Sequence, residues 1–149
     1  MTTANGYYIE ELSTGMEAVF AKVISDDDIT AFAGVSGDTN PVHLNDVYAS
    51  KTRFGGRIAH GMLSASLISA VIGTKLPGPG AIYMSQSLKF RAPVKPGDEV
   101  TARVVIASID DKRRRVTLTC TAHVGDVLVI DGEAMVMVPS KADLGDNKA

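Results

Sequence analysis

Two residue types suited to acid–base chemistry lie close together in the segment GDTNPVHLN, residues 37–45. Asp38 provides a carboxylate and His43 an imidazole, with Pro41 between them. A carboxylate and an imidazole that hold one water molecule from two sides can orient it and accept its proton. The same spacing also suits a turn in which Asp38 and Asn40 bond to nearby backbone N–H groups. The segment therefore predicts either an acid–base pair or an Asx-type turn, and the surrounding elements must decide.

The composition is that of one globular domain. The chain has 149 residues, of which 45% are hydrophobic and 21% charged, and its formal net charge is −2. A chain of this length buries about two thirds of its unfolded surface, which is enough for one core. The charge, with no basic stripe and no RNA-type aromatic motif, argues against nucleic-acid binding. No metal-ligand spacing or phosphate-loop motif stands out, so no metal is expected.

Cysteine usage and the apolar segments bear on the compartment. The single cysteine, Cys120, excludes an intrachain disulfide and suits a reducing environment. The first residues, MTTANGYYIEEL, lack the basic start and the apolar run of a signal peptide. The most apolar segment, residues 62–72, is too short to span a bilayer. The sequence thus predicts a cytoplasmic protein without a membrane segment.

The first half of the chain combines one predicted strand with helical segments. Residues 17–24 are rich in β-branched and aromatic side chains, which favours a strand. A helix is predicted to follow, with Ser25 as its N-cap, Asp28 completing a capping box and Gly37 ending it. In residues 60–76 the polar side chains between the ends are serines, and a helix that is apolar all round is usually buried.

The second half changes to the period-two pattern that is typical of strands. Four long alternating segments are separated by turn residues, at 81–90, 98–109, 114–124 and 126–138. Consecutive strands joined by short turns form an antiparallel sheet. A flat α+β sandwich would leave part of the apolar helix against solvent. We therefore predict an α+β fold of the single hot-dog type, an antiparallel β-sheet wrapped around a long buried helix. Met84 and Phe90 are expected either in the core or on a side of their strand that lines an acyl tunnel.

Several segments together carry a family resemblance. They are SGDTNPVHLN, RIAHGMLSASLISAVIG, the stretch from LPGPGAIY to GDEVTARV, and the late DGEAMV. The chain resembles the MaoC-like dehydratases, and within them the (R)-specific enoyl-CoA hydratases, also called hydratase 2. The most specific element is D-x-N-P-x-H followed by the H-G-M helix start. The resemblance covers residues 15–139, which leaves an N-terminal extension at 1–14. The tail at 140–149 is polar, so we expect it to be flexible.

The resemblance also implies an activity and a site. The activity is the reversible addition of water to trans-2-enoyl-CoA, giving (R)-3-hydroxyacyl-CoA. Asp38 and His43 would hold the catalytic water, with Asn40 as a supporting amide. Gly61, at the predicted start of the buried helix, would offer its backbone N–H to the thioester oxygen. Ser66 falls where the family has a small polar residue near the aspartate, and His60 would orient the loop through hydrogen bonds.

The resemblance further implies the partners of the chain. Coenzyme A is part of the acyl-CoA thioester substrate, so no separate cofactor is expected. A single hot-dog repeat implies that two chains pair, as a homodimer or a larger homo-oligomer. The pathway expected from the resemblance links fatty-acid oxidation to polyhydroxyalkanoate supply. Four cationic residues either meet the phosphates of coenzyme A or are solvated, and they are Arg53, Arg57, Lys89 and Arg91.

Three other functions remain open on the same fold. A 3-hydroxyacyl-[acyl-carrier-protein] dehydratase would use the same residues on a carrier-protein substrate, and a basic docking surface would favour it. A hot-dog thioesterase would not need the D-x-N-P-x-H motif, although fold alone does not fix function. A non-catalytic acyl-CoA-binding module would not need Asp38 and His43 together with Gly61.

Overall fold

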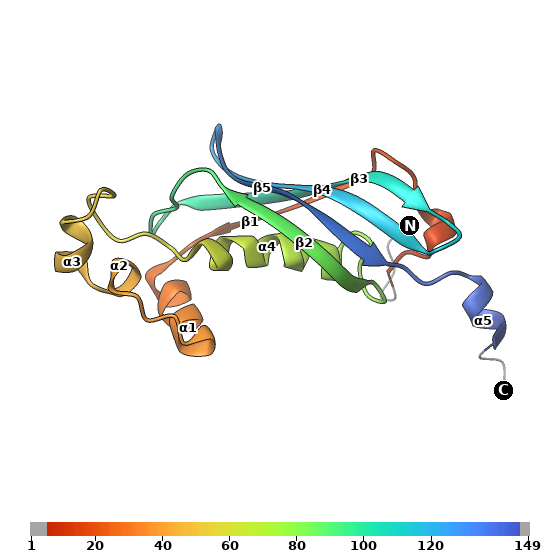
Figure 1. Cartoon of the computed structure of the whole chain (residues 1–149), viewed down its shortest axis with the longest axis horizontal. Helices are drawn as coiled ribbons and strands as arrows, with labels where there is room; N and C mark the ends of the chain where they lie inside the picture. Colours follow the sequence, from red (N-terminus) through yellow and green to blue (C-terminus); the bar gives the residue numbers. More distant parts are fainter. Residues whose placement is uncertain (1–5, 147–149) are drawn as a thin grey trace.

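The computed structural model describes residues 6–146, in which one antiparallel five-stranded sheet lies against a helix (Figure 1). The strands are β1 (Glu17–Val23), β2 (Ile82–Phe90), β3 (Glu99–Asp110), β4 (Arg115–Val124) and β5 (Val127–Met137). Their order across the sheet is β1-β3-β4-β5-β2, so β1 and β2 form its edges. The five segments predicted as strands all form strands, which confirms the α+β hot-dog class.

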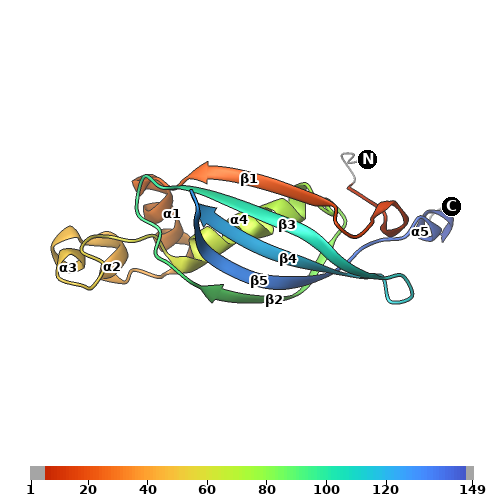
Figure 2. The same cartoon turned by 90° about the horizontal axis from the view of Figure 1, so that it is seen from above.

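The helices between β1 and β2 fall into two groups. The first three gather at one end of the sheet and the fourth runs beneath it (Figures 1 and 2): α1 (Asp26–Ser36), α2 (Pro41–Leu44), α3 (Asp46–Ser50) and α4 (Gly61–Thr74). The predicted capping box is confirmed, because Ser25 Oγ accepts the Asp28 N–H at 3.1 Å and Asp28 Oδ2 accepts the Ser25 N–H at 3.0 Å. Gly37 ends α1 with a φ of 81°, a left-handed conformation that glycine adopts without strain.

The core lies between the inner face of the sheet and α4. In β3 and β4 alternate side chains are buried, among them Val104, Leu118 and Cys120, as a half-buried strand requires. Ile68 and Val71 of α4 belong to the same core. Burying one such aliphatic side chain contributes about 1.5–3 kcal/mol, so this contact holds the sheet and helix together.

The helix α4 is buried on one side, which corrects the expectation of a helix enclosed all round. Ile68 faces the core, but Met62 and Ser66 are exposed. Figure 1 shows the reason, since the sheet covers α4 from one side and leaves the other side open. Of the two positions left open for Met84 and Phe90, the core is wrong, because their side chains are 47% and 52% exposed. Phe90 instead lines the cavity described below, and Met84 does not.

The described residues of the expected N-terminal extension and C-terminal tail both contact the rest of the domain. Near the start, a 3-10 helix (Ile9–Glu11) buries Ile9, whose N–H donates to Pro139 O at 2.9 Å. After β5, a short helix α5 (Ala142–Asp146) brings Asp143 to Arg114 at 2.5 Å. These hydrogen bonds and the ion pair fix both segments, whereas residues 1–5 and 147–149 lie outside the described residues. Within residues 6–146, every helix is too short or too polar to cross a bilayer.

Candidate active site

The D-x-N-P-x-H segment lies between α1 and α2. Pro41 is the first residue of α2, where its fixed φ and missing N–H suit a helix start. Asn40 caps this helix, since its Oδ1 accepts the Val42 N–H at 3.1 Å. Asp38 Oδ1 in turn accepts the Asn40 N–H at 3.2 Å. The Asx-type turn is therefore present, and it fixes the loop that carries Asp38 and His43.

Asp38 and His43 lie together with His60, the residue that precedes α4. Their carboxylate oxygen and ring nitrogens lie within 4.8 Å of one another. The two imidazoles stack, with ring centroids 3.9 Å apart and planes at 27°. Asp38 is exposed, whereas His43 and His60 are 8% and 2% exposed. Three of the predicted site residues, Asp38, His43 and His60, thus share one site.

Hydrogen-bond partners define which ring nitrogens can accept a proton. His43 Nδ1 lies 2.8 Å from Ile58 O. Because a carbonyl oxygen can only accept, Nδ1 carries the hydrogen and the neutral ring has its free lone pair on Nε2. His60 Nε2 lies 2.9 Å from Asp38 O, so in His60 the lone pair is on Nδ1. His43 can therefore act as a base through Nε2, while His60 donates to the backbone of Asp38.

The N-terminus of α4 adds hydrogen-bond donors to the site. Gly61 is the first helical residue, and the side chain of His60 at the N-cap does not bond to the helix end. Among the described residues, the N–H groups of Gly61 and Met62 have no acceptor. Free N–H groups at the positive end of a helix dipole can stabilise a developing oxyanion. A Cβ on Gly61 would lie 2.7 Å from Phe90 Cε1, so a larger residue here would displace the Phe90 ring.

A cavity of about 480 Å³ opens beside these groups. Asp38, His60 and Gly61 line it, together with the aromatic ring of Phe90. His43 does not line the cavity, but its ring stacks on that of His60. A mostly apolar pocket with a few converging polar groups is typical of a small-molecule site. Its other lining residues are Arg53, Phe54, Ile58, Ala59, Met62, Ser64, Arg91, Ala92, Pro93, Val94 and Ile130.

The serines of α4 are placed differently from the sequence expectation. Ser66 is exposed, does not line the cavity and donates its Oγ hydrogen to Leu63 O at 2.5 Å. Ser64 lines the cavity and is buried. Neither Ser64 Oγ nor His60 Nδ1 has a hydrogen-bond partner among the described residues, which leaves both for a ligand or a water. The spacing of four between His60 and Ser64, one helical turn, is the signal that could have identified Ser64.

The four cationic residues considered for phosphate binding separate into two groups. Arg53 and Arg91 line the cavity, whereas Lys89 and Arg57 do not. Arg91 is paired with Asp131 at 3.2 Å. Within the part of the chain that the structure describes, Arg53 makes no ion pair, so its charge is available to a ligand.

The donor set of the site fits a metal ion poorly. Asp38, His43 and His60 are the group within residues 6–146 whose donor atoms lie close enough to be considered. A metal ion bound by an imidazole lies near the plane of the ring, about 2.0–2.1 Å from its nitrogen. Two rings stacked at 3.9 Å and 27° share no such position. The cluster is therefore better suited to holding water and protons than to holding a metal.

The fold and the site define a hot-dog protein whose D-x-N-P-x-H segment lies beside the N-terminus of its central helix. The chain belongs to the MaoC-like domain family, whose profile matches residues 10–127. The (R)-specific enoyl-CoA hydratase of Rhodospirillum rubrum is 55% identical over 91% of this chain and 94% of its own. The 3-hydroxybutyryl-CoA dehydratase of Methylorubrum extorquens is 52% identical over 91% of this chain and 87% of its own. Among solved structures, an unliganded R-hydratase of Pseudomonas aeruginosa has a TM-score of 0.86 and 43% identity, covering 91% of this chain and 88% of its own.

Proposed function

We propose that the protein is an (R)-specific enoyl-CoA hydratase, which adds water reversibly to trans-2-enoyl-CoA to give (R)-3-hydroxyacyl-CoA. The observation that carries the proposal is the cluster of Asp38, His43 and His60 next to the free N-terminus of α4. Relatives that are named for this reaction, or for its reverse on a four-carbon substrate, support it.

Each step of the reaction has a group suited to it. A water molecule held between the Asp38 carboxylate and His43 Nε2 attacks the β-carbon, and its proton passes to one of these two groups. Negative charge then develops on the thioester oxygen, where the Gly61 N–H and the dipole of α4 stabilise it. Loss of one such donor typically costs about 2.7–4 kcal/mol of transition-state stabilisation. The reaction is completed when the acid–base pair returns a proton to the α-carbon.

The cavity offers separate surroundings for the two parts of the substrate. The aromatic rings of Phe54 and Phe90 line it and suit the acyl chain. Arg53 brings a guanidinium to the same cavity, and guanidinium groups bind phosphates through paired hydrogen bonds. Coenzyme A enters as part of the substrate, and no metal or further cofactor belongs to the proposal. The proposed location is the cytoplasm, where the buried free thiol of Cys120 would stay reduced.

We also propose that two chains pair through the edge strand β2 and the open face of α4. Four large apolar side chains of β2 are exposed, Ile82, Tyr83, Met84 and Phe90, and Met62 is exposed on α4. An edge strand with exposed apolar side chains needs a cover, and a second β2 related by a twofold axis would provide one. Sedimentation should give twice the chain mass, and Met84→Glu should reduce it to one chain. In such a dimer Ser66, on the open face of α4, would face the partner rather than its own cavity. The supporting role expected of Ser66 would then be exerted on the site of the partner subunit.

The proposed reaction can be followed by the loss of enoyl-thioester absorbance with crotonyl-CoA. The wild type is compared with Asp38→Asn and His43→Gln, and Asp111→Asn on the distant β3–β4 hairpin is the matched control. We expect the wild type to form an (R)-3-hydroxyacyl product, detected with a stereospecific dehydrogenase. We expect kcat to fall about 10²–10⁴-fold in Asp38→Asn and His43→Gln and to stay unchanged in Asp111→Asn.

Three outcomes would overturn the proposal. A folded wild type that acts on enoyl-carrier-protein but not on crotonyl-CoA would indicate the carrier-protein dehydratase. Tight crotonyl-CoA binding without turnover would indicate a binding module. Equal activity of Asp38→Asn and the wild type would remove Asp38 from the mechanism.

A further inference from the structure

The helix that carries His43 is too short to fix its own position. The helix α2 is a single turn of four residues, and isolated helices shorter than about 12–15 residues are marginal in water. Its place therefore depends on contacts with other segments. Residues 57–58 supply these contacts, since the Ile58 N–H donates to Val42 O at 3.3 Å and Ile58 O accepts the His43 Nδ1–H at 2.8 Å.

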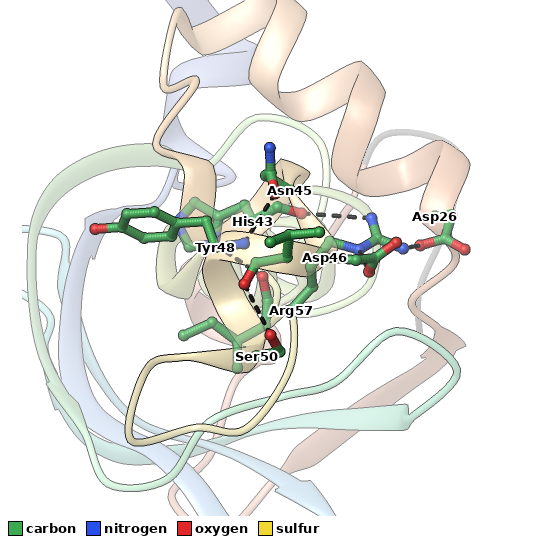
Figure 3. Close-up of polar contacts among 9 residues, drawn as sticks. Asp26, His43, Asn45, Asp46, Tyr48, Ser50 and Arg57 are labelled. Atoms are coloured by element: carbon green, nitrogen blue, oxygen red, sulfur yellow. Dashed lines mark hydrogen bonds and ion pairs between the residues drawn. The ribbon is translucent and has the colours of Figure 1, made fainter.

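Arg57 extends this contact to three helices at once (Figure 3). Its Nε donates to Asp46 Oδ1 of α3 at 2.7 Å, and its Nη2 donates to Asp26 Oδ1 of α1 at 2.5 Å. Its Nη1 lies 3.4 Å from His43 O of α2. Among the described residues, no other guanidinium is paired with two carboxylates. The hydrogen bonds that Arg57 donates to Asp46 and Asp26 raise the pKa of Arg57 above its ordinary value, so its guanidinium stays charged.

We infer that Arg57 is a positioning residue for His43, because its guanidinium fastens the single turn α2 to α1 and α3. The inference rests on the proposed function, in which His43 holds the catalytic water. Arg57 does not line the cavity, so its effect reaches the reaction through His43 and not through the substrate. The three nitrogens of the planar guanidinium each donate a hydrogen bond to a different helix, and the single ammonium of a lysine does not have this geometry.

The alternative role for Arg57 is a merely stabilising one. The side chain of Arg57 is 19% exposed, but those of Asp26 and Asp46 are 63% and 85% exposed. Ion pairs with such exposed carboxylates add little to global stability. The positioning role can therefore be separated from a stabilising role by measuring the rate, the order of α2 and the overall stability side by side.

The test compares Arg57→Met and Arg57→Lys with Arg103→Met, whose guanidinium pairs with Glu17 on the β1–β3 edge. For Arg57→Met we expect kcat on crotonyl-CoA to fall about 10–100-fold while KM stays within about threefold, since small misplacements of a catalytic group are that costly. The amides of His43 and Asn45, which bond within the 40–45 turn, should exchange faster with solvent. Guanidinium at millimolar concentration should restore part of the rate, and Arg57→Lys should be intermediate.

Three results would overturn the inference. The first is a kcat of Arg57→Met within about twofold of the wild type, below the cost expected of a misplaced group. The second is unchanged amide exchange at His43 and Asn45. The third is an equal loss of rate in Arg103→Met, accompanied by the same fall in thermal unfolding temperature. If the wild type itself does not hydrate crotonyl-CoA, the proposed function fails, and the exchange rates still decide whether Arg57 holds α2.

Discussion

The imidazole of His60 stacks on that of His43, with centroids 3.9 Å apart. The same side chain donates from Nε2 to Asp38 O at 2.9 Å, so it contacts both members of the acid–base pair. Phe32 also packs against the His60 ring, at 4.8 Å between centroids and 56° between planes. His60 is thus held by its own neighbours and sets the spacing between Asp38 and His43.

This arrangement predicts the effect of replacing His60. The variant His60→Phe keeps an aromatic ring next to His43 but removes the donor to Asp38 O. We expect kcat for crotonyl-CoA to fall about 10–100-fold because the loop at Asp38 is no longer fixed. Steady-state kinetics beside a thermal unfolding curve measure this, with Phe32→Leu as the control for packing alone. A kcat equal to that of the wild type would show that the hydrogen bond to Asp38 has no part in catalysis.

The contact between Gly61 and Phe90 predicts a steric effect that a second substitution relieves. In Gly61→Ala the new Cβ would lie 2.7 Å from Phe90 Cε1 and 2.8 Å from Phe90 Cδ1, so the ring must move within the cavity. Because Phe90 is half-exposed, its ring can turn away, and its new position narrows the cavity beside Gly61, so we expect kcat/KM to fall at least about tenfold. The double variant Gly61→Ala/Phe90→Ala should recover activity, because the backbone N–H is still present. If it does not, the methyl group blocks the substrate itself and the explanation through Phe90 is wrong.

The capping box of α1 predicts a pH-dependent contribution to stability. The Ser25 N–H, and then the Lys22 ammonium at 3.0 Å, hold the pKa of Asp28 below its ordinary value of 3.8. A carboxyl group with a lowered folded-state pKa stabilises the protein above its unfolded-state pKa, and this stabilisation is lost as the pH falls through the folded-state pKa. We expect Asp28→Asn to lower the free energy of unfolding by about 0.3–1 kcal/mol at neutral pH. Urea titrations should show the difference shrinking below pH 3.8, and a difference independent of pH would contradict this account.

The stacking of His43 on His60 predicts that hydration does not depend on a metal ion. Because the two rings share no position where one ion could meet both lone pairs, dialysis against a strong chelator should leave kcat unchanged. Metal analysis of the dialysed protein gives the control. Loss of activity on dialysis, restored by adding back a divalent ion, would show that the cluster is a metal site after all.

Local patterns were enough to predict much of the fold. The period-two segments form the strands β2 to β5. The helix α1 begins at the capping box of Ser25 and Asp28 and ends at Gly37, as these residue types predict. These features depend on residues close in sequence, so a single chain reveals them.

The features that the sequence missed depend on distant residues. The apolar composition of α4 did not show that one of its faces lies open, because composition does not say how far the sheet curls. The composition of α4 does not distinguish Ser64 from Ser66, but the two serines lie on different faces of the helix, one buried and one exposed. The ion pair between Arg57 and Asp26 joins residues 31 positions apart, and no local pattern marks such a pair.

The groups proposed to do the chemistry come from one continuous stretch, residues 38–61, which lies between β1 and β2. The wall of the cavity opposite them comes from other segments, Phe90 to Val94 and Ile130. The proposed chemical groups therefore lie in one segment, whereas the cavity wall is shared between that segment, which contributes Phe54, and Phe90 to Val94 and Ile130. Substitutions at Phe90 or Ile130 would change the shape of the cavity without replacing any group proposed to take part in the reaction.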